Sequence, residues 1–255
     1  MKYYKELAKF YTFTLNDATN IIGSVVASKK YLESMIKEGA VHRIKKNLYT
    51  CYNFAEYSDC ANRFQIASSL NEDSFVSYHS AFEFYGFYNQ MYFEMQVSST
   101  KKIQSFEYDD YRYVNYLTNT TAQVDIVKGA RVSSIERTIV DSIDMLGKVM
   151  DIEELTECLN RIHIVDEKKI IEMLKIYDKP LLYKKVGYIL SYYKDDYKLS
   201  KEFFLLCKEK CKLSNINYLV SSDKKNTTFN SEWRMYVYSD IRNIGYEGGN
   251  LNVYV

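Results

Sequence analysis

A short stretch near the N-terminus changes from a helical to a strand-like pattern of apolar and polar positions. Leu32, Met35 and Ile36 are spaced as one apolar stripe on a helix. Ser28 is a candidate N-cap for this helix, and Gly39 is the residue type that ends helices in the left-handed conformation. The pattern therefore predicts a helix that begins after Ser28 and ends at Gly39.

After Gly39 the positions alternate as in a strand, with Val41, Arg43 and Lys45 on one side and His42, Ile44 and Lys46 on the other. Asn47 interrupts the alternation, and the β-favouring residues of Leu48–Tyr52 resume it, which predicts a hairpin. A basic helix followed by a basic hairpin is the layout of a winged helix-turn-helix, which lays one helix in the major groove of DNA.

Two shorter helices are expected before this stretch, over residues 2–10 and 15–22. Thr14 and Asp17 have the spacing of a capping box at the start of the second helix. Three short helices and a hairpin fit an N-terminal winged helix-turn-helix domain over residues 1–55.

The remainder, residues 56–255, is expected to form one larger mixed domain. β-rich runs predict a small antiparallel sheet within about 56–150, and helical patterns dominate about 151–213. A β-like tail is expected over 214–255. The fold class predicted for the whole chain is α+β.

Composition indicates an ordinary globular protein of 255 residues, with 47% hydrophobic and 26% charged residues. The sequence contains neither an apolar run of about 18 residues that would span a membrane nor a recognisable signal peptide. Its five cysteines, at irregular spacings, are typical of reduced thiols. These features predict a cytoplasmic protein that does not contact a membrane.

Charge is unevenly distributed, although the net charge is only +1. Residues 1–50 contain nine Lys and Arg against four Asp and Glu, whereas residues 51–255 contain 25 against 29. This asymmetry favours a nucleic-acid contact at the N-terminal end. The candidate DNA-contacting residues are the polar and basic side chains of the helix and hairpin: Ser28, Lys29, Lys30, Ser34, Lys37, Arg43, Lys45 and Lys46.

Other chemistry is weakly represented. Ser77, His79 and Asp141 could suggest a hydrolase triad, but no nucleophile-elbow motif is present, and Asp141 follows Arg137 by four residues, as in an intrahelical ion pair. Paired lysines such as Lys184-Lys185 have the appearance of a solvated surface. The sequence therefore predicts no catalytic residue.

Metal and cofactor sites are also poorly supported. Cys207 and Cys211 share a helical face, but no further ligands accompany them, so they are better interpreted as small buried residues. Asp223 and Glu232 only partly match the acidic pattern of a metal-dependent nuclease. We therefore expect no bound metal and no cofactor.

Three blocks, taken in order, resemble a known family. They run from Leu32 to Tyr49, from Phe75 to Gly86 and from Ala130 to Asp141. Together they are similar to the AbiEi-type antitoxins, which are transcriptional regulators of type IV toxin–antitoxin systems in abortive infection. The resemblance covers about residues 1–145. Where that family favours Gly at the tip of the wing, this chain has Asn47, which tolerates the left-handed conformation better than other side chains.

The resemblance implies a non-enzymatic antitoxin that represses its own operon and counters a nucleotidyltransferase-type toxin. The expected partners are that toxin and inverted repeats of double-stranded DNA, on which two copies would pair. Two alternatives remain open at this level. One is a nucleic-acid-processing enzyme with a winged-helix targeting module, and the other is a repressor that senses a small ligand in its sheet region.

Overall fold

The computed structural model describes most of the chain: residues 2–88, 92–212, 214–221, 225, 227–238 and 241–242. Their contacts form two compact units. The first contains the described residues of 2–80 and 92–133, and the second contains those of 81–88 and 134–242. Both helices and strands are present, so the predicted α+β class is confirmed. The boundary expected at residue 56 does not coincide with this division.

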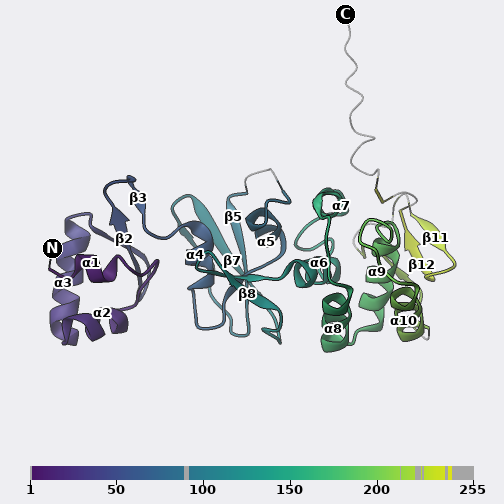
Figure 1. Ribbon diagram of the computed structural model, residues 1–255, viewed down its shortest axis with the longest axis horizontal. Helices are drawn as coiled ribbons and strands as arrows, with labels where there is room; N and C mark the ends of the chain where they lie inside the picture. Colours follow the sequence, from purple (N-terminus) through teal and green to yellow (C-terminus); the bar gives the residue numbers. More distant parts are fainter. Residues whose placement is uncertain are drawn as a thin grey trace, which may run out of the picture. The chain divides into compact units, whose positions relative to one another are not determined.

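The first unit begins with three helices and a small antiparallel sheet of order β1-β2-β3 (Figure 1). We call these elements the N-terminal module. They are α1 (Tyr4–Leu7), α2 (Leu15–Ile22), α3 (Val25–Lys37), β1 (Val41–Lys45), β2 (Leu48–Asn53) and β3 (Ser58–Asp59).

Helix α2 has the predicted bounds because its capping box forms. The Thr14 hydroxyl accepts from the backbone N–H of Asp17, and the Asp17 carboxylate accepts from the backbone N–H of Thr14. Gly23 ends α2 with a φ of 91°, a left-handed value that glycine adopts without steric cost. The chain therefore turns immediately after α2.

Helix α3 begins earlier than expected. Ser24 is its N-cap, with its hydroxyl accepting from the backbone N–H of Ala27, so the prediction of Ser28 as the cap is wrong. The reason is that Gly23 reverses the chain within one residue, which leaves Ser24 in the extended conformation that a cap requires. Valines 25 and 26 consequently lie in the first turn of α3.

The predicted hairpin is confirmed, with β1 and β2 antiparallel and a register irregularity between Arg43 and Lys45. Because of this irregularity, Val41 and Ile44 are both buried although they are three residues apart. Asn47 occupies the turn with a φ of 62°, the left-handed conformation that its position requires.

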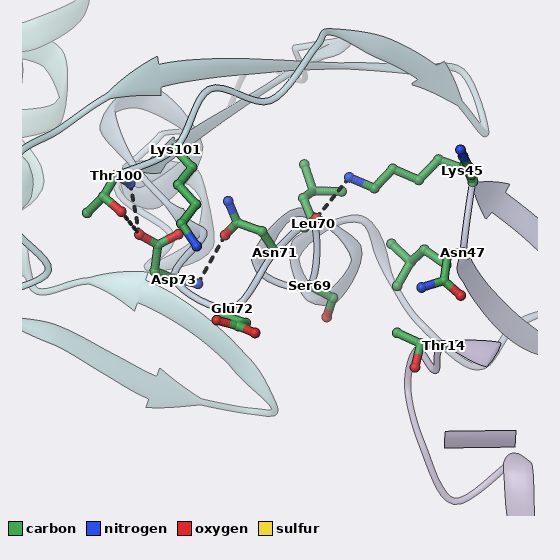
Figure 2. Close-up of a pocket in the computed structure, with 12 residues that line it drawn as sticks. Thr14, Lys45, Asn47, Ser69, Leu70, Asn71, Glu72, Asp73, Thr100 and Lys101 are labelled. Atoms are coloured by element: carbon green, nitrogen blue, oxygen red, sulfur yellow. Dashed lines mark hydrogen bonds between the residues drawn. The ribbon is translucent and has the colours of Figure 1, made fainter. Parts of the chain in front are cut away.

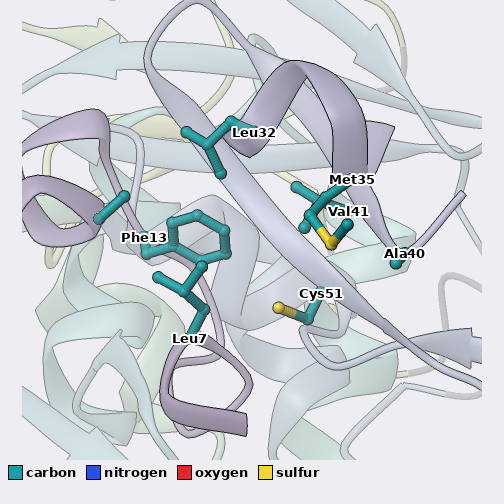
Figure 3. Packing of buried hydrophobic residues seen from close by; sticks show 8 residues of the cluster. Leu7, Phe13, Leu32, Met35, Ala40, Val41 and Cys51 are labelled. Carbon is teal, nitrogen blue, oxygen red and sulfur yellow. The ribbon is translucent and has the colours of Figure 1, made fainter. Parts of the chain in front are cut away.

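A small apolar core holds the N-terminal module together (Figure 3). Figure 3 shows Leu7 and Phe13 facing Leu32 of α3, with Cys51 of β2 beside them. The predicted apolar stripe of α3 is confirmed for Leu32 and Met35, but Ile36 is exposed. The buried face of α3 therefore leaves its opposite face to solvent.

The rest of the first unit is a six-stranded sheet of order β6-β7-β5-β4-β9-β8. It is larger than expected and mixed, since β5 with β7 and β4 with β9 are parallel pairs. Its strands and associated helix are α4 (Arg63–Ser68), β4 (Phe75–Val76), β5 (Glu94–Ser99), β6 (Phe106–Tyr108), β7 (Tyr111–Leu117), β8 (Val124–Val127) and β9 (Ala130–Ser133). Helix α5 (Tyr78–Phe84) begins in the first unit and continues into the second.

The second unit is mainly helical, as predicted. Side chains of Asp151, Asp166 and Ser200 cap three of its helices, and Pro180 occupies the first turn of a fourth. Its elements are α6 (Ile135–Asp144), α7 (Ile152–Arg161), α8 (Glu167–Tyr177), α9 (Pro180–Ser191), α10 (Lys201–Cys211), β10 (Asn217–Tyr218), β11 (Thr228–Asn230) and β12 (Met235–Val237).

Candidate nucleic-acid interface

The outer face of α3 carries three of the eight predicted contact residues, all of them lysines. Lys29, Lys30 and Lys37 are all exposed, and Glu33 is exposed between them. Residues 26, 30, 33 and 37 follow one another at helical spacings of four, three and four, so they form a single stripe on α3. We call Val26, Lys30, Glu33 and Lys37 the outer stripe.

Two predicted serines behave differently from these lysines. Ser28 is fully buried, and its hydroxyl donates to the backbone oxygen of Ser24 at 2.7 Å, so its prediction as a contact residue is wrong. Its position, four residues after the true cap, directs it toward the core. Ser34 is exposed, and its hydroxyl donates to the Glu38 carboxylate at 2.9 Å.

The three predicted contact residues of the hairpin also differ in their exposure and contacts. Arg43 and Lys46 are exposed, as a contact with DNA requires. The Lys45 ammonium instead donates to the backbone oxygen of Leu70 at 2.9 Å, and burial lowers the pKa of Lys45. Lys45 therefore joins the hairpin to the segment after α4, and its prediction as a contact residue is not supported.

The hairpin tip is fixed from its other side by Asn47. The side-chain oxygen of Asn47 accepts from the backbone N–H of Leu15 at 3.0 Å, in the first turn of α2. Two backbone hydrogen bonds of 2.9 Å also join Phe13 to Tyr49, whose rings stack. Since the tip is bound to α2 in this way, the exposed groups of the hairpin and of α3 keep a defined spacing.

A polar pocket of about 680 Å³ adjoins the hairpin tip (Figure 2). Its lining includes Lys46 and Asn47 of the turn, Glu72 and Asp73 of the loop after α4, and Lys101 at the end of β5. The volume is within the range of small-ligand sites, although such sites are usually more apolar. Lys45, Lys46 and Lys101 exceed Glu72 and Asp73 in this lining by one charge, which favours an anionic occupant.

The loop that lines this pocket is held by specific hydrogen bonds. Asp73 accepts from the backbone N–H and hydroxyl of Thr100 (Figure 2). Burial by itself raises the pKa of Asp73, but the hydrogen bonds from Thr100 lower it by more. The pKa of Asp73 therefore lies below its usual value. The Arg131 guanidinium donates to backbone oxygens of the loop, at 2.9 Å for Ser74 and 2.7 Å for Asn71. The pocket is therefore built on a fixed backbone.

The residues that could suggest a hydrolase have structural partners. Asp141 accepts from Arg137 at 3.1 Å, which confirms the predicted intrahelical pair, and from the Tyr177 hydroxyl at 2.5 Å. Burial raises the pKa of Asp141, and the charge of Arg137 opposes this rise. The Ser77 hydroxyl accepts from Ser98 at 2.9 Å. His79 is 2% exposed, and its ring packs against that of Tyr92 with 3.9 Å between the ring centroids. All three side chains therefore have structural contacts within the fold.

Cys207 and Cys211 are both buried, as predicted for small core residues, and burial raises the pKa of Cys207 to about 12. Within the described ranges, no three His, Cys, Asp or Glu side chains lie close enough together to hold a metal ion. Asp223 lies outside the described residues. Glu232 accepts from the Lys208 ammonium at 2.5 Å.

The lysine pair 184–185 is not a solvated surface, contrary to the prediction. Lys184 is 1% exposed and donates to the backbone oxygens of Asn215 and Arg234, and Lys185 is 8% exposed. Both lie on α9, whose entire central part is buried in the second unit. Consecutive lysines in this sequence therefore do not by themselves indicate an exposed basic surface.

Sequence reasoning missed the exposed Val25 and Val26 on α3, since it placed the start of the helix at Ser28. The signal that could have revealed them is Ser24 directly after Gly23, a stop for one helix followed by a cap for the next.

None of the helices in the described part of the chain has the length and apolarity to cross a membrane.

Neither a protein-family model nor a curated protein sequence matches this chain. Among solved structures, the chain is similar to the crystal structure of RV2827C protein from Mycobacterium tuberculosis. The TM-score is 0.63, the match covers 92% of this chain and 89% of that chain, and the sequences are 12% identical. At this identity the likeness concerns the fold alone.

Proposed function

We propose that the N-terminal module is a winged helix-turn-helix that binds double-stranded DNA, with α3 as its recognition helix and the β1–β2 hairpin as its wing. The observation that carries the proposal is the exposed cationic face of α3, with Lys29, Lys30 and Lys37 directed away from the core. The short connection between α2 and α3 contains a glycine, Gly23, as helix-turn-helix turns often do, and Arg43 and Lys46 of the hairpin are exposed.

We further propose that the protein represses its own operon and acts as the antitoxin to a nucleotidyltransferase-type toxin. This part rests on the sequence resemblance of the three blocks to AbiEi-type antitoxins. In that role it is a cytoplasmic, non-enzymatic protein without cofactor. Two copies would occupy the inverted repeats of one operator, since a palindromic site mirrors a pair of readers.

The test of DNA binding is the double variant Lys29→Ala/Lys30→Ala, measured by fluorescence anisotropy on DNA from the gene's own upstream region. We expect at least about ten-fold weaker binding, a salt slope lower by about 2, and an unchanged melting temperature. The matched control is Lys168→Ala/Lys169→Ala, which removes the same charge from an exposed pair on α8. Equal affinity of the two double variants would refute the DNA-binding assignment.

The antitoxin role predicts a nucleotidyltransferase gene beside this one, and it is tested separately by co-expression of the full-length chain with that toxin. We expect wild type to restore growth and the Lys29→Ala/Lys30→Ala variant to restore it as well, provided that both are expressed from a foreign promoter. Toxicity that persists in the presence of wild-type protein would refute the antitoxin role and leave the DNA-binding proposal intact.

The pocket at the hairpin tip favours one second candidate, a repressor that senses an anionic ligand. An occupant between Lys46 and Lys101 would contact the hairpin directly and would alter DNA affinity. Raised thermal stability in the presence of nucleotides or other anionic metabolites, absent from a Lys101→Ala variant, would support this function. A melting temperature that none of these compounds changes would argue against it.

A further inference from the structure

Two apolar side chains lie exposed at the beginning of α3. Val25 is 50% exposed and Val26 is 66% exposed, and neither belongs to the core cluster of the N-terminal module. They occupy the first turn of the helix, after the Ser24 cap. β-branched residues gain little from such a position in an isolated helix, so local stability does not explain this choice of side chain.

Val26 differs from Val25 in the direction it faces. Successive helical residues are rotated by about 100°, so Val26 lies at the head of the outer stripe with Lys30, Glu33 and Lys37. Val25 lies on the flank of that stripe. In helix-turn-helix proteins, the N-terminal residues of the recognition helix contact base edges.

The side chains of the outer stripe indicate that this face of α3 contacts base edges in the major groove rather than the phosphate backbone. Glu33 is exposed in its middle, and a carboxylate there would be repelled by phosphates. A carboxylate facing base edges can instead accept from the exocyclic amino group of cytosine. The stripe therefore presents an apolar, a cationic and an anionic group to base edges, and the C5-methyl of thymine is the largest apolar group that the bases present in the major groove.

We propose that Val26 contacts a thymine methyl group in each operator half-site and that this contact contributes to sequence specificity. The inference rests on the proposed DNA-binding function. It assigns to Lys30 and Lys37 the neighbouring base or phosphate contacts, and it predicts that each half-site contains at least one thymine opposite the N-terminal turn of α3.

The test first locates the operator in the gene's own upstream region by footprinting. Each thymine of the operator is then replaced in turn with uracil, which removes only the methyl group. At one thymine per half-site, wild-type affinity falls about four-fold, equivalent to the ~0.8 kcal/mol of one buried carbon group. Val26→Ala weakens binding to the unmodified operator and abolishes the response to uracil at that position, so the two changes form a double-mutant cycle with a coupling term. Val25→Ala, the matched control, keeps the wild-type response.

Several outcomes would overturn the inference. These are a uracil response that is the same in wild type and Val26→Ala, a response that disappears only in Val25→Ala, or no response to uracil at any position. Conversion of a dimer in solution to a monomer by Val26→Ala would also overturn it, because the exposed valine would then serve contact with a second copy. A wild-type protein that binds no DNA refutes the proposed function as well, which separates the two failures.

Folding of the variants is checked by circular dichroism and melting temperature. Alanine favours helices more than valine does, so Val26→Ala should keep the helix. Val26→Thr is a second variant of similar shape that retains one methyl group, and it should keep part of the response to uracil. A complete response to uracil in Val26→Ala, with the fold intact, contradicts the contact.

Discussion

Two pairs of consecutive lysines look alike in the sequence, but one pair is exposed in the structure and the other is buried. Lys29 and Lys30 are exposed on α3 of the first unit, whereas Lys184 and Lys185 are buried on α9 of the second. Burial lowers the pKa of both buried lysines. A lysine pair therefore indicates a surface for a polyanion only where its helix has another face to bury.

The reason lies in the apolar neighbours of each pair. In α3, apolar side chains occupy one stripe, and Lys29 and Lys30 fall outside it. In α9, apolar residues surround the helix, so no face is left for solvent. The Lys184 ammonium is then satisfied by two backbone oxygens, those of Asn215 and Arg234. Under the proposed function, lysine side chains serve DNA affinity in the first unit, whereas in the second unit they serve tertiary structure.

The largest expected effect separates these two roles by stability. Lys184→Ala should lower the free energy of unfolding by about 2–3 kcal/mol, because buried backbone oxygens lose a charged donor. Lys30→Ala should change it by less than about 0.5 kcal/mol, as for most exposed positions. Urea denaturation of the three proteins measures both. Equal stabilities of the two variants would contradict the structural role of Lys184.

A smaller effect distinguishes neighbouring lysines of the hairpin. Lys45→Ala should cost about 1 kcal/mol of stability, because it removes the hydrogen bond to Leu70. Lys46→Ala should leave stability unchanged but reduce the slope of DNA affinity against salt by about 1. Urea denaturation and anisotropy at several salt concentrations give the two readouts. A lower salt slope in Lys45→Ala would return this residue to the DNA interface.

The smallest expected effect concerns pH. Burial lowers the pKa of Lys185 from its ordinary value of 10.5, although the charge of Asp144 raises it. The unfolded chain therefore keeps this proton to a higher pH than the folded chain does. Stability from Lys185 is fully present above pH 10.5 and is lost as the pH falls through the lowered value.

Lys185→Met removes this titration. The difference in free energy of unfolding between wild type and variant should therefore move in favour of wild type as the pH rises from the lowered pKa of Lys185 toward 10.5. Other titrating groups are common to both proteins and cancel in the difference. Urea midpoints at several pH values provide the measurement, and a difference independent of pH would show that Lys185 titrates alike in both states.

The sequence by itself determined most of the local structure of this protein. The capping box of Thr14 and Asp17, the left-handed Asn47, and the helices that begin after Asp151 and Ser200 depend on hydrogen bonds between residues close in the chain. Such features can be read without knowledge of the fold. The α+β class followed from them.

Tertiary structure decided the features that depend on distant residues. The start of α3 at Ser24 is not such a feature, because the Gly23 stop and the Ser24 cap are neighbours in the chain. The Lys45 ammonium donates to the Leu70 backbone oxygen, 25 residues away in the chain, and is therefore not available to the candidate interface. Lys184 is buried by its packing in the second unit. The parallel pairing of β5 with β7 likewise joins strands separated by β6. A charge pattern is local, but whether a charge meets water or protein is settled by segments elsewhere in the chain.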